Sequence, residues 1–290
     1  MAAVNPTRPL MKIAVPNKGS LADGAAQMLH EAGYAQRSDN KELVLLDEAG
    51  GVEFFYLRPR DIALYVGEGT LDVGITGRDM LLDSGAHAAE ELALGFGASR
   101  FRFARRAGSG LSIPDLDGLR LATSYPGLVG KYLADRGVSA RLIRLDGAVE
   151  TAIRLGVADV IADVVETGTT LRQAGLELFG EPILESEAIL ITRVGSAPPA
   201  GLDQFLRRLS GVLVARNYVM MDYDVADEHV AEACAITPGF ESPTVSPLAR
   251  PGWHAVRAMV PRAEAQRIMD DLWTVGARAI LVTDIAACRI

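Results

Sequence analysis

The stretch ADVIADVVETGTTL, residues 158–171, decides the fold because an apolar run ends there in a loop of glycine and hydroxyl residues. The run 159–165 predicts a buried strand of the kind found in alternating β and α units. In the loop, Gly168 can adopt backbone angles closed to other residues. A helix over residues 171–174 would direct its free N–H groups toward an anion. The stretch therefore predicts the end of a strand that carries an anion site.

The side chains of this loop suit a phosphorylated sugar. Thr167, Thr169 and Thr170 offer hydroxyls beside backbone N–H groups. Asp163 and Glu166 carry negative charge, which repels bare phosphate but suits ribose hydroxyls or a bound Mg²⁺. The alternative is an ordinary strand-to-helix turn with a threonine cap. The loop alone does not decide between the two.

Outward from this loop, short apolar runs alternate with longer helical patterns. Such alternation predicts βαβ units and a largely parallel sheet. The first set has expected strands at 12–16, 52–57 and 72–76 and expected helices at 20–32, 60–68 and 79–83. The second set has expected strands at 119–123, 141–145 and 159–165, a helix at 125–136 and another that Gly147 opens. Residues 100–110 interrupt the pattern, so we expect a crossing between two lobes there.

A third domain follows the clearest linker, GSAPPAG at residues 195–201. After a helix at 202–216, the expected elements are strand 218–225, helix 227–235, strands 243–248 and 253–260, helix 261–275 and strand 278–284. The order βαββαβ predicts a ferredoxin-like unit, with one sheet and two helices on one face. The sequence of this segment does not pair a nucleophilic side chain with a general base, so we expect a binding or assembly module.

Composition narrows the class of protein. With 290 residues, 49% of them hydrophobic, the chain has material for two or three packed domains. The formal net charge of −8 argues against a nucleic-acid partner, and the chain has no membrane-length apolar run. Cys234 and Cys288 are too few for a disulfide scaffold or a zinc site, which favours a cytoplasmic location. The first ten residues lack a signal peptide's apolar core, so we expect a disordered leader.

Four motifs in a fixed order resemble a known family. They are PNKGSL at 16–21, RPRDIALYVGEGTLDVGITGRD at 58–79, DGAVETAIRLGVAD at 146–159 and the loop at 163–171. Together they are similar to the ATP phosphoribosyltransferases, which catalyse the first step of histidine biosynthesis. The resemblance extends from Lys12 to the end of the chain. It includes the C-terminal extension of the long, histidine-regulated form.

The resemblance implies an α/β architecture of two periplasmic-binding-protein-like lobes plus a C-terminal ferredoxin-like (βαββαβ) regulatory domain. Catalytic lobe I would take residues 11–99 and be completed by 190–216, because the expected strand at 188–193 would return to it. Catalytic lobe II would take residues 100–189, and residues 217–290 would bind histidine. The resemblance also implies a homo-oligomer, from dimer to hexamer, in which the third domains cluster.

The implied reaction joins two substrates. N1 of the adenine of ATP would attack C1 of the ribose in phosphoribosyl pyrophosphate, and pyrophosphate would leave with Mg²⁺ as cofactor. Asp163 would contact the ribose hydroxyls directly or through Mg²⁺, and Glu150 would face the same crevice. The 5′-phosphate would lie on the loop Glu166, Thr167, Gly168, Thr169, Thr170 and Leu171. Some members carry Ser or Gly where Glu166 stands, which makes Asp163 the stronger candidate. Glu150 has a plainer alternative role, as a charge placed well against a helix dipole.

The same resemblance assigns the nucleotide to lobe I, with contacts from Lys18, Gly19, Arg58, Gly77 and Asp79. The two glycines permit close approach, and an arginine fork can hold phosphate bidentately. Arg60 competes with Arg58 for that role. The alternatives are a capped turn with a surface lysine at PNKGSL, a helix cap at Asp79, and one arginine that is a surface charge or an ion-pair partner of Asp61. Ser20 stands where many relatives have arginine.

The inhibitor histidine is assigned to the third domain. Asp224, expected to close the strand MMDYD, would pair with the ligand's ammonium or imidazolium group. Ser242 and Thr244 would offer hydroxyls. Phe240, Met259 and the backbone around Ala279 would complete the pocket. The alternative is that Asp224 ends a strand and that Ser242 and Pro243 shape a turn.

Two competing functions stay open. A solute-binding or sensor protein would use the same bilobal fold without catalysis. The absence of an export signal argues against that carrier, and Asp163 with its loop argues for a phosphorylated sugar. A transferase resembling porphobilinogen deaminase would need a cofactor-bearing cysteine in a lobe, and neither Cys234 nor Cys288 lies in the first two lobes.

Overall fold

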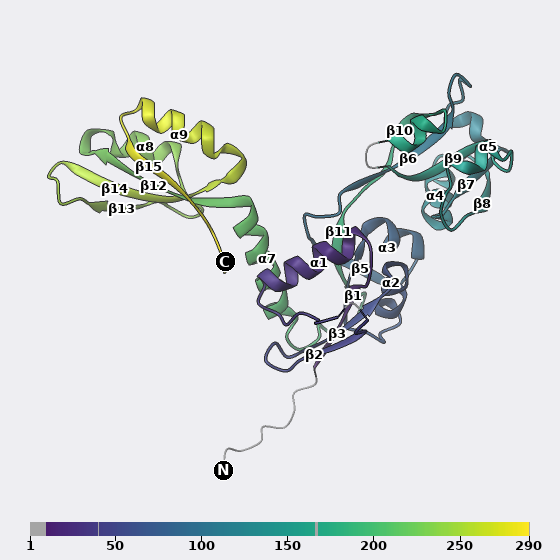
Figure 1. The fold of residues 1–290 in the computed structure, drawn as a ribbon, viewed down its shortest axis with the longest axis horizontal. Coiled ribbons are helices and arrows are strands. Elements are labelled where there is room, and N and C mark those ends of the chain that lie inside the picture. Colours follow the sequence, from purple (N-terminus) through teal and green to yellow (C-terminus); the bar gives the residue numbers. More distant parts are fainter. Residues whose placement is uncertain (1–9, 40, 166–167, 290) are drawn as a thin grey trace, which may run out of the picture. The chain divides into compact units, whose positions relative to one another are not determined.

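The structure is a computed structural model that describes residues 10–39, 41–165 and 168–289 (Figure 1). The chain divides into two compact units, Met1–His30 with Tyr34–Leu202 and Glu31–Gly33 with Asp203–Ile290. The described residues of the first unit form two sheets, and we call these sheets with their helices lobe I and lobe II. Those of the second unit form one further sheet.

Lobe I is built on a sheet with the order β2-β3-β1-β4-β11-β5. Its strands are β1 (Met11–Pro16), β2 (Val44–Asp47), β3 (Val52–Leu57), β4 (Val73–Gly77), β5 (Ala88–Ala93) and β11 (Ala188–Arg193). Its helices are α1 (Ser20–Glu31), α2 (Pro59–Gly67) and α3 (Arg78–Ser84). Strands β3, β1 and β4 are parallel, so their last residues Pro16, Leu57 and Gly77 lie at one edge of the sheet. That edge carries the loops of the PNKGSL, RPRD and GRD motifs.

The expectation of a largely parallel sheet was wrong. In lobe I, β2, β11 and β5 run antiparallel to their neighbours, because β11 comes back from the other lobe and the other two strands lie at or near the edges. The return of strand 188–193 to this lobe is confirmed, since β11 pairs with both β4 and β5. Strands β2 and β5 had no counterpart among the predicted elements.

Lobe II has a sheet with the order β10-β6-β9-β7-β8. Its strands are β6 (Ser99–Arg106), β7 (Arg120–Thr123), β8 (Arg141–Arg144), β9 (Val160–Val165) and β10 (Leu176–Ser186). Its helices are η1 (Pro114–Leu116), α4 (Pro126–Ala134), α5 (Thr151–Arg154) and α6 (Thr169–Gln173). Strands β8, β7 and β9 are parallel, so the segments after them also share one edge.

Residues 100–110 do more than cross between the lobes. Most of them belong to β6, which pairs antiparallel with both β9 and β10. The reason lies in the alternation of its sequence RFRFA, which turns Phe101 and Phe103 into one core while Arg100 and Arg102 lie on the opposite face of the strand. Met80 of lobe I packs against the same core.

The second unit confirms the βαββαβ order. After α7 (Leu202–Asn217), its elements are β12 (Tyr218–Ala226), η2 (Asp227–His229), α8 (Val230–Ile236), β13 (Thr244–Pro247), β14 (Trp253–Pro261), η3 (Arg262–Glu264), α9 (Ala265–Thr274) and β15 (Arg278–Asp284). The sheet order is β13-β14-β12-β15, and each neighbouring pair is antiparallel. Alternate residues of β12, such as Val219 and Tyr223, are buried in one core with residues of α8 and α9.

The expectation that Asp224 closes the strand MMDYD was wrong. Strand β12 continues to Ala226 because its pairing with β14 extends to Trp253. Both cysteines, Cys234 and Cys288, are free. Within the described part of the chain, no helix has the length and apolar character needed to cross a membrane. The expected disordered leader falls mostly on residues 1–9, outside the described residues.

Candidate active site

Asp163 lies near the end of β9 and is half-buried. Its Oδ1 accepts a hydrogen bond from the N–H of Val164 at 2.8 Å. Burial raises the pKa of the Asp163 carboxyl above its ordinary value, and the negative charge of Glu150 raises it further, while the Arg60 guanidinium opposes this change. The structure therefore brings Asp163, Glu150 and Arg60 within electrostatic reach of one another, although they come from three distant parts of the sequence.

A helix opened by Gly147, with Glu150 inside it, was expected, and this expectation was wrong. Gly147 and Ala148 have φ angles of 114° and 48°, which no right-handed helix accommodates, so α5 begins only at Thr151. Glu150 is the residue before it, and its side chain makes no capping bond. Because α5 has only four residues, its dipole gives no sufficient account of this carboxylate.

The loop after β9 has the backbone that its glycine predicted. Gly168 has a φ of 67° and directly precedes α6, which starts at Thr169, two residues earlier than expected. Glu166 and Thr167 lie outside the described residues. The N-cap position is Gly168, and no side chain of a described residue caps the helix there. The threonine-cap alternative thus has no support from the described residues.

The remaining loop residues divide into two kinds. Thr169 and Thr170 are exposed, and the Thr169 hydroxyl accepts a hydrogen bond from Arg172 Nη2 at 3.4 Å. Leu171 is 9% exposed and packs in a core cluster with Val165. The Leu171 side chain therefore anchors the loop, and only its backbone is available for ligand contact.

At the facing edge of lobe I, Lys18 and Gly19 are exposed between β1 and α1. Gly19 has a φ of 79°, the left-handed region that favours glycine. Beside it, Asn17 Oδ1 is buried and makes no hydrogen bond to any described residue. A buried polar atom without a hydrogen-bond partner destabilises the folded protein, and a polar ligand bound at this loop would supply the missing partner.

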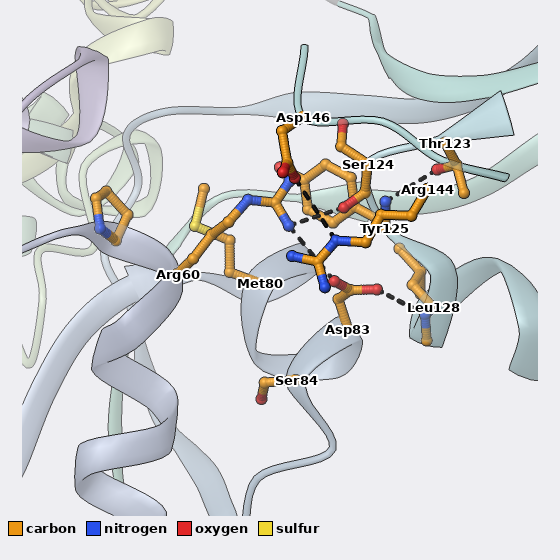
Figure 2. A network of polar contacts seen from close by, with 12 residues as sticks. Arg60, Met80, Asp83, Ser84, Thr123, Ser124, Tyr125, Leu128, Arg144 and Asp146 are labelled. Carbon is orange, nitrogen blue, oxygen red and sulfur yellow. Dashed lines mark hydrogen bonds and ion pairs between the residues drawn. The ribbon is translucent and has the colours of Figure 1, made fainter. Parts of the chain in front are cut away.

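The two arginines of RPR have different positions. Arg58 is exposed at the N-cap of α2 and forms no ion pair with any described residue. Arg60 points toward lobe II instead, as Figure 2 shows: its Nη1 donates to the Ser124 carbonyl at 2.8 Å. Its guanidinium carbon lies 4.2 Å from the centre of the Tyr125 ring. Neither arginine pairs with Asp61 among the described residues, so the ion-pair alternative was wrong, whereas the exposed Arg58 fits the alternative of a surface charge.

Gly77 and Asp79 are both buried where β4 meets α3. A Cβ atom at Gly77 would overlap Asp79 Oδ1, which explains the glycine. Asp79 is the second residue of α3 and only 5% exposed, and its Oδ1 accepts from Ser186 Oγ at 2.9 Å. Burial raises the pKa of Tyr125 far above its ordinary value, and the Asp79 carboxylate raises it further. The helix-cap alternative for Asp79 was therefore wrong.

Sequence reasoning missed three residues here, namely Asp83, Tyr125 and Ser186. Asp83 of α3 accepts hydrogen bonds from the amides of Gly127 and Leu128 in lobe II (Figure 2). One signal was available: α4 begins with Tyr-Pro, and tyrosine is not a capping residue. A helix start without its own cap indicates a partner from elsewhere in the fold.

Acidic groups and one arginine thus meet where the two lobe edges face each other. The pKa of Asp163 responds to Glu150, Arg60 and Asp79, and that of Tyr125 responds to Asp79, Arg60 and Asp163. Half-buried carboxylates of this kind suit a ligand rich in hydroxyls or one that develops positive charge. Among the described residues, no group of three or more His, Cys, Asp or Glu side chains is placed to hold a metal ion.

In the second unit, three of the expected histidine contacts share one face of the sheet. The register pairs Met220 with Met259 and Thr244 with Arg257, on the face opposite the buried positions of β12. Asp224 has the same parity in β12 and joins them. Because the strand continues past Asp224, the alternative in which this residue ends the strand was wrong.

The other expected contacts surround this face. Ala279 has a φ of 51° where the pairing of β12 with β15 shifts register, and a left-handed alanine is a strained conformation. Phe240 is 45% exposed and meets Tyr218 edge to face at 5.6 Å. Ser242 is exposed, and its hydroxyl lies 3.5 Å from the Pro243 carbonyl.

Comparisons with known proteins agree with one another. The family model described as ATP phosphoribosyltransferase matches residues 58–211, and the model described as HisG, C-terminal domain, matches residues 215–287. The ATP phosphoribosyltransferase of Streptomyces avermitilis is 65% identical over 285 residues, covering 97% of this chain and 100% of that protein. The enzyme of the same name from Salinispora tropica is 62% identical over 281 residues, with the same coverage.

One solved structure also resembles the chain. It is the ATP phosphoribosyl transferase (HisG:HisZ) complex from Thermotoga maritima, with a TM-score of 0.58 and 26% sequence identity. The match covers 69% of this chain and 97% of that chain.

Proposed function

The chain belongs to the ATP phosphoribosyltransferase family and is a pentosyltransferase, and from this premise we propose that it joins the phosphoribosyl group of phosphoribosyl pyrophosphate to N1 of ATP. The bond from N1 to the ribose C1 forms as the bond from C1 to pyrophosphate breaks. The observation that carries this proposal is the meeting of Asp163 and Glu150 of lobe II with Arg60 and Asp79 of lobe I. A donor on one lobe and an acceptor on the other would meet there.

Lobe II would hold the phosphoribosyl donor. Asp163 would accept hydrogen bonds from the ribose hydroxyls and place its carboxylate near the positive charge that develops at C1. The backbone at Gly168 and the exposed hydroxyls of Thr169 and Thr170 would hold the 5′-phosphate. Since α6 has only five residues, this assignment rests on direct hydrogen bonds rather than on a helix dipole. Glu166, Thr167 and the Leu171 backbone belong to the same proposed loop.

Lobe I would hold ATP. Lys18 and Arg58 are exposed cations at the facing edge and would contact the nucleotide's phosphates, with Gly19 allowing close approach. Gly77 would bring the end of β4 close to the nucleotide. Asp79 is buried, hydrogen-bonded to Ser186 and near enough to Tyr125 to raise the pKa of that tyrosine, so we assign it the task of orienting Tyr125 beside the substrates.

Mg²⁺ would bind with the substrates. This ion prefers oxygen ligands and usually keeps several waters, using one or two carboxylates plus substrate phosphates. Asp163 and Glu150 provide that number of carboxylates, and the described residues hold no larger cluster. The ion would neutralise the departing pyrophosphate, while Asp163 keeps the ribose in place.

Histidine inhibition and assembly complete the proposal. Asp224, Thr244, Met259 and the strained backbone of Ala279 would form the inhibitor site on the face of the sheet away from the helices. Phe240 and Ser242 would border it. The enzyme would work in the cytoplasm as a homo-oligomer, from dimer to hexamer.

The direct test is turnover. The protein is incubated with ATP, phosphoribosyl pyrophosphate, Mg²⁺ and pyrophosphatase, and the absorbance of the adduct is followed, with each substrate omitted in turn. We expect the adduct only when both substrates are present. A folded protein that binds one or both ligands without forming the adduct would instead be a sensor or carrier.

A further inference from the structure

Helix α4 lacks a cap of its own. Its first residue, Pro126, has no N–H group, and the N–H of Val129 already bonds to the Tyr125 carbonyl at 3.1 Å. The amides of Gly127 and Leu128 have no intrahelical partner, as in the first turn of any α-helix. Tyr125 occupies the N-cap position, and its side chain makes no capping bond. Lobe II therefore leaves two donors open.

Asp83 of lobe I fills both positions. Its Oδ1 accepts from the Gly127 amide at 2.8 Å and from the Leu128 amide at 3.1 Å, while the side chain is only 14% exposed. Bonds from amides to an ionised carboxylate are stronger than neutral ones. A helix of one lobe is thus capped by a residue of the other, and the cap exists only while the lobes are docked.

Gly127 makes this approach possible. A Cβ atom at this position would overlap the backbone carbonyl oxygen of Asp83, and that oxygen cannot turn away as a flexible side chain can. Gly130, one turn along the same helix, differs. Its Cβ would lie 3.4 Å from Leu142 Cδ1, an ordinary contact inside lobe II. The two glycines therefore form a matched pair for experiment.

Arg60 extends the contact toward the active site. Its Nη1 lies 3.5 Å from Asp83 Oδ2 and donates to the Ser124 carbonyl (Figure 2). The Arg60 guanidinium also lies over the Tyr125 ring, 4.2 Å from its centre. The segment after β7 is consequently tied to lobe I by its carbonyl, by its tyrosine and by its helix start, and this segment lies at the same sheet edge as Asp163.

We propose that Asp83 is a positioning residue for the transfer reaction, which by capping α4 across the lobes sets the separation at which Asp163 faces the nucleotide loops of lobe I. The reaction named here rests on the proposed function, whereas the docking does not. Substrates that bridge the lobes must bind at this separation, so once the docking is lost part of their binding free energy is spent on restoring it. Asp83 itself touches no reacting atom.

The docking is tested without substrates, by amide hydrogen exchange of the full-length protein followed in peptides spanning residues 124–130. Asp83→Ala should speed exchange at residues 127 and 128 by about tenfold, the usual effect of losing a cap. Asp83→Asn should keep most protection, because asparagine also caps helices. Gly127→Ala should behave like Asp83→Ala, and Gly130→Ala should behave like wild type. Unchanged exchange in both Asp83→Ala and Gly127→Ala overturns the proposal.

The positioning role is tested by kinetics of the same variants. Substrates that bridge the lobes must supply the lost docking free energy from their own binding, so Asp83→Ala should raise KM by about tenfold and change kcat less. Asp83→Asn should restore most of the wild-type KM. If protection from exchange is lost but KM stays unchanged, Asp83 docks the lobes without positioning the substrates, and the proposal is wrong. Absence of turnover in wild type would instead refute the proposed function, while the exchange result would still judge the docking.

Discussion

Ser186 and Asp79 hold each other by two hydrogen bonds: Ser186 Oγ accepts from the Asp79 amide at 3.0 Å and donates to Asp79 Oδ1 at 2.9 Å. Ser186 ends β10 of lobe II, and Asp79 lies in the first turn of α3 of lobe I. Both residues are buried, at 5% exposure each. The pair thus joins the lobes where the chain passes from one to the other.

Ser186→Ala should destabilise the protein by about 1–3 kcal/mol, because it leaves a buried carboxylate and a buried amide short of a partner. The measurement is the free energy of unfolding, taken from the urea-induced unfolding transition of the first unit. Ser246→Ala, at an exposed position in β13, serves as the control and should change the free energy of unfolding by less than about 0.5 kcal/mol. Equal effects of the two substitutions would contradict the role given to the Ser186 hydroxyl.

Asp163→Asn should lower turnover by on the order of 10²-fold, since it removes a charge whose contact strengthens in the transition state. Glu166→Gln should cost less, because Asp163 is the carboxylate expected to meet the ribose. Steady-state kcat for both variants, with folding checked by circular dichroism, makes the comparison. An equal or reversed order would refute the assignment of Asp163.

The raised pKa of Asp163 predicts a pH dependence of stability. Its folded-state pKa lies above the value in the unfolded chain, mainly through burial, so the folded state binds the proton more tightly. The stabilisation is then present below the unfolded-state pKa and is lost as the pH rises through the folded-state pKa. Asp163→Asn should flatten this part of the curve and equal or exceed wild type in stability at neutral pH. The measurement is thermal unfolding of both proteins from acidic to neutral pH. A variant less stable than wild type at neutral pH would contradict this assignment of the Asp163 pKa.

Gly168→Val should abolish binding of phosphoribosyl pyrophosphate in a folded protein. Valine resists the φ of 67° found here and adds bulk to the loop, with a stability loss of about 1–3 kcal/mol from backbone strain. Gly156→Val is the matched control, because Gly156 has a φ of 72° but precedes β9, at the other end of the strand from Asp163. Isothermal calorimetry should show binding lost in the first variant and kept in the second. Retained affinity in Gly168→Val would remove the loop from the donor site.

Asp224→Ala should desensitise the enzyme to histidine with little loss of basal rate. The physical reason is that an inhibitor shifts an equilibrium only through its differential affinity for two states, and loss of a charged contact reduces that difference. Asp284→Ala, an exposed carboxylate at the end of β15 in the same domain, is the control. Inhibition curves for histidine test both variants. Competition between histidine and phosphoribosyl pyrophosphate, unaffected by Asp224→Ala, would disprove a site in this domain.

Local patterns in the sequence predicted those elements whose cause is local. Strand 52–57 was predicted with the bounds found for β3, because its alternate residues Val52, Phe54 and Tyr56 are buried. Strand 278–284 and the helix before it were also predicted. The strand β5 was not, since its sequence AAEELA has low strand propensity and becomes a strand only by pairing with β11.

Contacts between distant segments left no such local trace. No feature of the sequence around α4 identifies Asp83 as the cap of this helix, because the two segments meet only when both lobes have folded. The choice between Arg58 and Arg60 likewise depended on the direction in which α2 presents each side chain. The helix expected from Gly147 was wrong for a local reason, the left-handed angles at Gly147 and Ala148, and glycine alone did not reveal the alanine.

The insertion of β11 between β4 and β5 has a consequence for how the chain is made. On the ribosome β4 and β5 emerge early, but the strand that separates and joins them follows only after all of lobe II has been synthesised. Lobe II is continuous in sequence and can fold as it leaves the exit tunnel. The lobe whose synthesis begins first is therefore the one completed last, with its sheet open along the edge of β4 until residues 188–193 arrive.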